Sequence, residues 1–183
     1  IINYTVFMAF GEVTCMIFGG LSPVFTKTVG SKRMAFFWSA LLCLVLSIAF
    51  FFIPMSPDYI WVMIALVILT SIGIGIYSPL MWSMYADVAD YHTEHFGTSA
   101  TGLIFSSGTM SQKFGTAISG SLIALFLGWA GANMITDKMG NTVIDPTSIT
   151  DSVLMMVWSL FSLFPAVIAF LLMVLSYRFP IKK

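Results

Sequence analysis

Residues 98–125 read TSATGLIFSSGTMSQKFGTAISGSLIAL, a long run of apolar and small residues in which Lys113 is the only charge. A bilayer core about 30 Å thick takes roughly 20 residues of helix, so this run is long enough to span a membrane. The chain as a whole fits that setting: 58% of its 183 residues are hydrophobic, 9% are charged, and the mean hydropathy is +0.96. Soluble domains carry about 25% charged residues. The composition therefore excludes an ordinary soluble domain.

Counting apolar runs over the whole chain predicts an all-α fold, a polytopic membrane helix bundle with about five transmembrane helices. The spans are expected at about residues 3–25, 34–53, 59–85, 98–136 and 152–177, within a single membrane domain over residues 1–183. The polar segment between the third and fourth spans is expected to be a connection. Charge gives no reason to expect nucleic acid, because the eight basic and eight acidic residues cancel and form no basic stripe.

The distribution of Lys and Arg predicts the orientation of the chain. Positive residues are retained in the cytoplasm, and one side of the predicted bundle collects six of the eight: Lys27, Lys32, Arg33, Arg178, Lys182 and Lys183. The C-terminus is therefore expected in the cytoplasm and Ile1 outside. Because no leader precedes an outside start, we expect this chain to continue a longer protein with at least one earlier span.

Lys113 is the strongest candidate for a functional residue. It lies about 15 residues after Thr98, or roughly 22 Å along a helix, so its ammonium cannot easily reach either interface. A lysine at that depth costs about 2.5 to 3.5 kcal/mol on insertion scales, and it is expected to face a cavity or a carboxylate. The residues on its helical face are small or polar: Gly102, Ser106, Thr109, Thr116, Ala117 and Gly120. The alternative is a structural lysine held in an ion pair inside the bundle.

Two further features of the spans allow more than one interpretation. Glu12 lies near mid-depth of the first span. It is either a charge partner of Lys113 or a cation ligand; the alternative is a carboxyl held protonated by hydrogen bonds, for example from Thr14. Tyr77 and Trp82 could stack on a sugar ring or serve as packing or interfacial aromatics, and for Trp82 the interfacial position is favoured.

The segment YADVADYHTEH, residues 85–95, is the only dense polar cluster. Asp87 and Asp90 share a helical face, and paired carboxylates can hold a magnesium ion or a diphosphate–metal complex. The alternative, which we favour, is a polar segment at the membrane surface whose acids pair with Lys32 or Arg33 across the cytoplasmic face.

Together these motifs resemble a known family. The run YADVADYHTEHFGTSATGLIFSSGTMSQKFGTAISG is similar to the stretch joining helices ten and eleven of the glycoside-pentoside-hexuronide cation symporters, the melibiose permease-like group of the major facilitator superfamily. LSPVFTKTVGSKR resembles the connection between helices eight and nine, and YRFPIKK the basic end after helix twelve. By this resemblance the chain holds helices eight to twelve of twelve, most of the carboxy-terminal half.

The resemblance implies a sugar symporter of the bacterial inner membrane that works by alternating access, driven by sodium or a proton. Sugar binding and coupling then fall on Lys113 and Thr109, with Gln112 and Ser106 beside them in the cavity. The coupling ion is expected mainly on the missing amino-terminal half, which is the expected protein partner. Asp87 and Asp90, with Lys32 and Arg33, are expected to close the cytoplasmic side as a gate.

No catalytic residue, metal site or cofactor is expected from the sequence, and the chain is not expected to be an enzyme. Two other classes stay open. A membrane-embedded enzyme could bind diphosphate through Asp87 and Asp90, but it predicts a second Asp-rich loop, which this sequence lacks. A non-transporting scaffold or sensor of the same fold would bind sugar without moving it.

Overall fold

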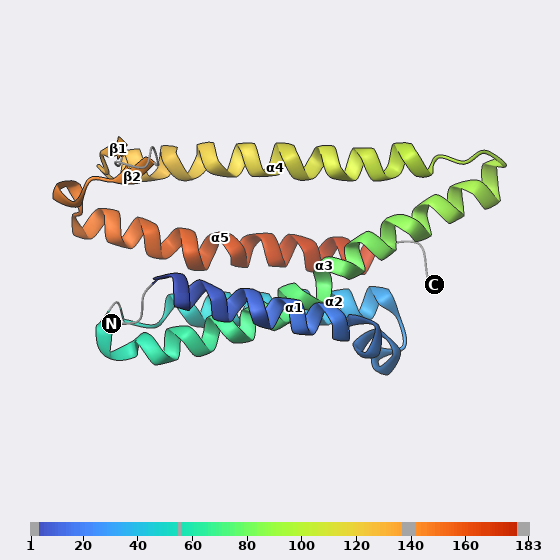
Figure 1. The fold of residues 1–183 in the computed structure, drawn as a ribbon, viewed down its shortest axis with the longest axis horizontal. Helices are drawn as coiled ribbons and strands as arrows, with labels where there is room; N and C mark the ends of the chain where they lie inside the picture. Colours follow the sequence, from blue (N-terminus) through green and yellow to red (C-terminus); the bar gives the residue numbers. More distant parts are fainter. Residues whose placement is uncertain (1–3, 55, 137–141, 179–183) are drawn as a thin grey trace.

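The computed structural model describes residues 4–54, 56–136 and 142–178 and has five long helices. They are α1 (Tyr4–Val29), α2 (Lys32–Phe51), α3 (Ile60–Phe96), α4 (Thr101–Trp129) and α5 (Asp151–Arg178), with 3-10 turns η1 (Pro57–Tyr59) and η2 (Pro146–Ser148). Successive helices run back and forth between the two ends of the molecule (Figure 1). The all-α membrane bundle predicted from the sequence is confirmed.

Four of these helices, all except α4, are long and apolar enough to cross a membrane. They also leave large apolar side chains on their outer surfaces, such as Met16 (77% exposed) and Leu175 (65% exposed), as expected of helices that face lipid. α4 is 29 residues long, which is enough to cross a membrane, so it differs from the other four in being less apolar. Its hydroxyl, amide and ammonium groups are typical of a helix that faces a polar cavity.

The helices α1, α2, α3 and α5 pack through small residues. Ala35, Ser39 and Ser162 are almost completely buried, which lets helix backbones approach each other closely. Gly73 and Gly75 do the same for α3: a Cβ atom on Gly75 would lie 2.6 Å from the carbonyl oxygen of Cys15 on α1. The core therefore depends on close backbone contact more than on large side chains.

α3 bends in the middle and carries its second half away from α1 and α2 toward the start of α4 (Figure 1). Pro79 lies inside this helix and has no N–H group, so the carbonyl of Gly75 loses its helical partner. One residue further on, the buried hydroxyl of Ser22 on α1 donates to the carbonyl oxygen of Ile76 at 3.1 Å. A neighbouring helix thus supports the backbone at the bend.

The bounds of α3 and α4 differ most from the prediction. α3 continues through the segment expected as a connection and ends at Phe96, followed by the C-cap Gly97 with a left-handed φ of 68°. The segment contains no internal Gly or Pro, and Ala89 is buried, so a helix can extend beyond the apolar run. The expected span 98–136 is helical only from Thr101 to Trp129.

After α4 the chain forms the short strands β1 (Met134–Thr136) and β2 (Thr142–Ile144), paired antiparallel with Met134 opposite Ile144. Gly131, with φ of 91°, ends the helical path. The hydroxyl of Ser148 accepts the backbone N–H of Asn133 and donates to the carbonyl of Asp145. The hairpin is therefore tied to η2, the 3-10 turn that precedes α5.

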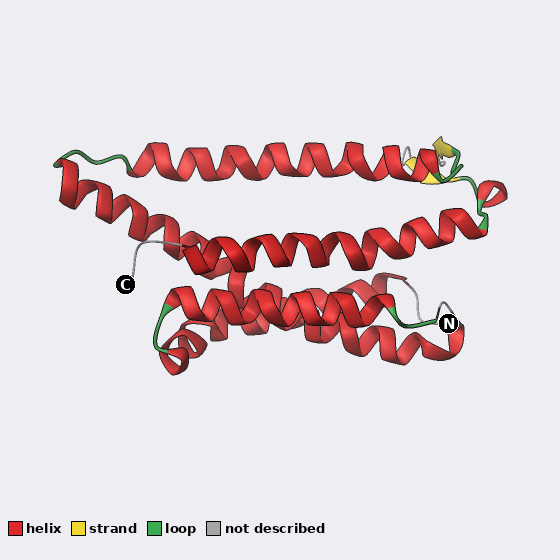
Figure 2. Ribbon diagram, turned by 180° about the vertical axis from the view of Figure 1, so that it is seen from behind, coloured by secondary structure: helices red, strands yellow, loops and turns green. Residues whose placement is uncertain are grey.

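The two ends of the bundle differ in charge. One end, called the basic end below, is where α1, α3 and α5 finish and α2 and α4 begin, and it carries Lys27, Lys32, Arg33 and Arg178. The hairpin lies at the other end (Figure 2). Lys182 and Lys183 of the orientation argument lie outside the described residues.

Candidate functional site

Lys113 lies near the middle of α4, about 18 Å along the helix from Thr101. Its side chain is exposed, on the side of α4 opposite Ile104 and Ser111, which face α3 and α5. Gly102 and Gly120 share the Lys113 face, and a Cβ atom on either would meet nothing within 4 Å. The predicted stripe of small and polar residues is therefore an open surface of the described part of the chain.

The hydroxyl groups beside Lys113 are tied to their own helix. Ser106 donates to the carbonyl of Leu103 at 3.1 Å, and Thr109 donates to the carbonyl of Ser106 at 2.9 Å. Each hydroxyl oxygen keeps lone pairs that can accept another hydrogen bond. The ammonium of Lys113 and the amide of Gln112 have no hydrogen-bond partner among the described residues. The face therefore offers donors and acceptors together.

No carboxylate of the described residues pairs with Lys113. Glu12 is exposed on α1 and makes no ion pair in this part of the chain. The hydroxyl of Thr14 donates to the carbonyl of Phe10 at 2.7 Å, so it does not hold the Glu12 carboxyl. The structure thus does not bring Glu12 and Lys113 together, and no internal ion pair accounts for the lysine.

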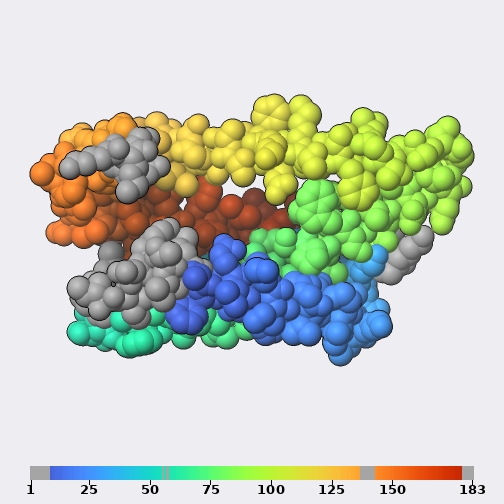
Figure 3. Space-filling view, viewed as in Figure 1, coloured from blue at the N-terminus to red at the C-terminus, as the bar shows by residue number. Residues whose placement is uncertain are grey.

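A hollow separates α4 from the layer formed by α1, α2 and α3, with α5 visible at its back (Figure 3). α4 meets the rest of the bundle mainly near its two ends. At one end Gly108 lies against the ring of Tyr85, and at the other Phe126 contacts Phe164 at 6.5 Å between ring centroids. The middle of α4, where Lys113 lies, is the part least covered by this chain.

The basic end holds a second polar site. The Lys32 ammonium at the start of α2 lies 2.8 Å from both carboxylate oxygens of Asp87 on α3. The Asp87 side chain is 13% exposed and the Lys32 side chain 31%, so water screens this pair only in part. The contact between an acid of residues 85–95 and Lys32, expected from the sequence, is present in the structure.

The other residues of the expected gate are arranged differently. Asp90 is exposed and makes no ion pair with a described residue. Arg33 reaches α5, where its guanidinium donates to the carbonyl of Tyr177 and lies 5.4 Å above the centre of that ring. Arg33 therefore joins α2 to α5, a role that sequence reasoning missed because no spacing relates the two residues.

The polar cluster of residues 85–95 does not form a metal site in the described part of the chain, where no three His, Cys, Asp or Glu side chains gather. The ring nitrogens Nδ1 of His92 and His95 lie 3.0 Å from the carbonyls of Thr98 and Tyr91. Asp87 is occupied by Lys32. This arrangement favours the surface segment over the diphosphate site.

The two aromatic candidates for sugar stacking are both engaged in packing. Trp82 lies parallel to Phe105 of α4, with ring planes 9° apart and centroids separated by 6.3 Å. Tyr77 meets Phe36 edge to face at 5.7 Å. These rings join α3 to α4 and to α2.

Sequence reasoning also missed Ser22, which supports the bend in α3. Pro79 was a usable signal for a bend, because a proline in a helix frees the carbonyl four residues earlier, here that of Gly75. The Ser22 hydroxyl binds the carbonyl of the next residue, Ile76, and nothing in the sequence says which helix supplies this contact.

Comparison with known proteins identifies the family of this helix arrangement. A family model described as MFS/sugar transport protein matches residues 2–183. The chain belongs to this family. The resemblance to the glycoside-pentoside-hexuronide symporters is therefore confirmed, and the chain is an integral membrane protein of a transporter family.

Three curated relatives from Escherichia coli K12 carry transporter names. The inner membrane symporter YicJ is 28% identical over 81% of this chain and 30% of its own length. The putative glycoside/cation symporter YagG is 29% identical over 62% of this chain and 26% of its own. The glucuronide carrier protein homolog is 33% identical over 61% of this chain and 24% of its own. The chain thus spans less than a third of each of these relatives. No solved structure gives a significant match.

Proposed function

We propose that this chain forms most of the carboxy-terminal half, helices eight to twelve of twelve, of a symporter that moves a sugar together with sodium or a proton. The observation that carries the proposal is the position of Lys113 near the middle of α4, on an open, polar face. If α4 crosses the membrane, the Lys113 ammonium lies at mid-depth. An ammonium at that depth needs a polar cavity or a carboxylate, and the described part of this chain supplies no carboxylate for it. The partner we propose is the amino-terminal half of the same transporter.

The Lys113 face has the chemistry that a sugar requires. Each sugar hydroxyl both donates and accepts hydrogen bonds. Lys113 and Gln112 offer N–H donors, while the hydroxyl oxygens of Ser106 and Thr109 accept. We propose these four residues as the contribution of this half to the sugar site. The relatives named for glycosides and glucuronides support a substrate of the glycoside, pentoside or hexuronide class.

Coupling follows from charge balance across the cavity. We propose that the coupling cation binds mainly to carboxylates of the amino-terminal half, with the Lys113 ammonium as their counter-charge and with no cofactor. With the cation bound, the site is close to neutral and the two halves can rock past each other. Without it, an unbalanced carboxylate would cross a region of low dielectric, which is costly. Glu12, exposed on α1, is a further acid that could face the same cavity.

We propose that the basic end is the cytoplasmic gate. Of the described Lys and Arg residues, four lie there and none lies at the hairpin end, which favours a cytoplasmic C-terminus in the inner membrane. The Lys32–Asp87 ion pair links α2 to the part of α3 beyond the bend, so a movement of that part must stretch the pair or carry it along. We propose Arg33 and Asp90, which follow Lys32 and Asp87 on α2 and α3, as further members of the gate.

Uptake of radiolabelled sugars by cells that express the complete transporter tests the proposal. A panel of glycosides, pentosides and hexuronides is offered with and without a sodium or proton gradient. Gradient-dependent accumulation of at least one sugar is expected. Saturable binding with no accumulation under any gradient would instead show a sensor of this fold and overturn the transport proposal.

A further inference from the structure

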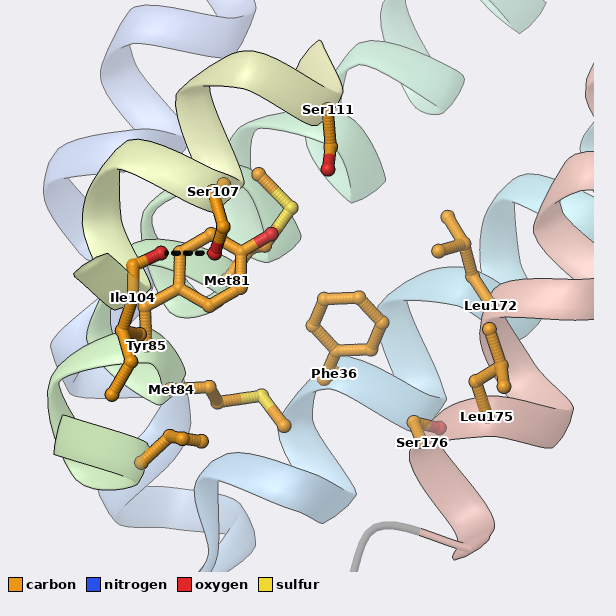
Figure 4. A pocket seen from close by; sticks show the side chains of 12 residues that line it. Phe36, Met81, Met84, Tyr85, Ile104, Ser107, Ser111, Leu172, Leu175 and Ser176 are labelled. Carbon is orange, nitrogen blue, oxygen red and sulfur yellow. Dashed lines mark hydrogen bonds between the residues drawn. The ribbon is translucent and has the colours of Figure 1, made fainter. Parts of the chain in front are cut away.

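A cavity of about 490 Å³ lies between α2, α3, α4 and α5 (Figure 4). Its lining includes Phe36, Met84, Tyr85, Ser107, Ser111 and Leu175. The volume is in the range of small-molecule sites, about 300 to 1,000 Å³. It borders the side of α4 opposite Lys113, so it is separate from the proposed sugar site.

The walls of this cavity suit hydrocarbon better than sugar. No charged side chain lines it, and aliphatic, aromatic and methionine side chains make up most of it. Of its hydroxyls, Ser107 donates to the carbonyl of Ile104 and Ser176 donates to that of Met173. The flexible thioethers of Met81 and Met84 can adapt to chains of varied shape. The cavity therefore favours an uncharged, apolar occupant.

The cavity also opens at the surface of α5. Leu175 lines it, yet 65% of the surface of Leu175 is exposed. The neighbouring Tyr177 is exposed as well. α5 is long and apolar enough to cross a membrane, so an opening on this helix can admit an acyl chain from the bilayer.

Cationic groups lie beside the same cavity at the basic end. Arg33 precedes the lining residue Phe36 by about one helical turn, a rise of about 4.5 Å, and its guanidinium covers the ring of Tyr177, next to the lining residue Ser176. Arg178 ends α5 directly beyond. Basic residues at a membrane surface attract anionic headgroups.

We propose that this cavity is a binding site for an anionic phospholipid. One acyl chain enters between α3, α4 and α5, and the phosphate lies against Arg33 and Arg178. An acyl chain alone would need only the apolar walls, and a phosphate alone only the arginines. Here the arginines lie at the end of the bundle and the apolar cavity lies next to them. A phospholipid has the same order, with its charged headgroup at the membrane surface and its hydrocarbon chains below.

The proposal is tested by native mass spectrometry of the chain in detergent with dioleoyl phosphatidylglycerol or dioleoyl phosphatidylcholine added. Ser111→Phe fills the cavity, and Ser121→Phe places the same ring on an exposed site of α4 outside it. The expected result is one phosphatidylglycerol bound at least about tenfold more tightly than phosphatidylcholine. Ser111→Phe is expected to abolish that preference and Ser121→Phe to keep it.

Arg33→Gln tests the headgroup contact without filling the cavity. It is expected to weaken phosphatidylglycerol binding about tenfold and phosphatidylcholine binding by less, because the choline group already balances the charge of the phosphate in the second lipid. Equal binding of the two lipids by the native chain would overturn the proposal. Undiminished lipid binding by Ser111→Phe would also overturn it. A third contradicting result is loss of the bound lipid in the complete transporter, because a segment of the other half would then fill the cavity. None of these three results tests the proposed role of Lys113 in transport.

Discussion

The ammonium nitrogen of Lys32 lies 2.8 Å from both carboxylate oxygens of Asp87, and this contact joins the start of α2 to α3 beyond its bend. Either residue alone could be a surface charge. Together they fix the part of α3 that leads into α4, the helix that carries Lys113. The position of the proposed sugar site therefore depends on a contact at the basic end.

Removing one partner of this pair is expected to destabilise the chain. Asp87→Asn should lower the free energy of unfolding by about 1 to 2 kcal/mol, because the pair is only partly exposed to water. Thermal unfolding in detergent measures the change, with Asp90→Asn, at an exposed acid on the same helix, as the control. In a double-mutant cycle with Lys32→Gln, the two effects should not add. Full additivity would show that the contact contributes nothing.

Ser22→Ala is expected to destabilise the bend in α3. The substitution leaves the buried carbonyl of Ile76 without the hydroxyl that now lies 3.1 Å away, at a cost of about 1 to 2 kcal/mol. Ser121→Ala is the matched control, because that hydroxyl is exposed and bonds only its own helix. If the two variants unfold at the same temperature, the contact between α1 and α3 is not what supports the bend.

Gly75→Ala is expected to separate α1 from α3. The new Cβ atom would lie 2.6 Å from a backbone oxygen of Cys15, which a side-chain rotation cannot relieve, so a loss of about 1 to 3 kcal/mol is expected. Gly20→Ala makes the same change on α1 where nothing lies within 4 Å. That control should be neutral or stabilising by up to about 1 kcal/mol, since alanine favours helix. Equal thermal stability of the two variants would contradict this packing.

The hairpin end is expected to loosen in acid. The backbone N–H of Thr147 donates to the Asp145 carboxylate at 2.9 Å and lowers the pKa of Asp145. The contribution of this hydrogen bond is therefore present above the ordinary carboxyl pKa and is lost as pH falls through the lowered one.

Amide exchange of Thr147, followed by NMR between about pH 5 and pH 2, measures this loss, after correction for the intrinsic pH dependence of exchange. Protection should fall in the native chain. It should stay constant in Asp145→Asn, which keeps a side-chain acceptor without a titrating group. A parallel fall in both would show that another group titrates.

The sequence was enough to predict the number of long helices, because four of them contain an apolar run of spanning length and α4 is a long run of apolar and small residues with a single charge. It also indicated the open face around Lys113, since helical spacing alone places Ser106 and Thr109 on its side. The extension of α3 to Phe96 was not predicted, because polar residues end a membrane span without ending a helix. The hairpin was missed because Met134 and Ile135 are as apolar as the helix before them.

Contacts between helices could not be read from the sequence. Two examples join residues far apart in the chain: the guanidinium of Arg33 lies above the ring of Tyr177, and the hydroxyl of Ser22 donates to the carbonyl of Ile76. Such pairs depend on how each helix is rotated and bent. The sequence indicates at most that a donor is needed near Pro79, or that a base at the basic end will find a partner.

The central claim is that Lys113 couples the sugar to the cation, and cation-driven uptake of labelled sugar by variants of the complete transporter tests it most directly. Lys113→Ala should abolish accumulation against a gradient, while Ser121→Ala, on the same helix outside the proposed site, should accumulate sugar as the native transporter does. Comparable amounts of both variants in the membrane establish that the loss is functional. Accumulation by Lys113→Ala with native dependence on the cation gradient would contradict the account.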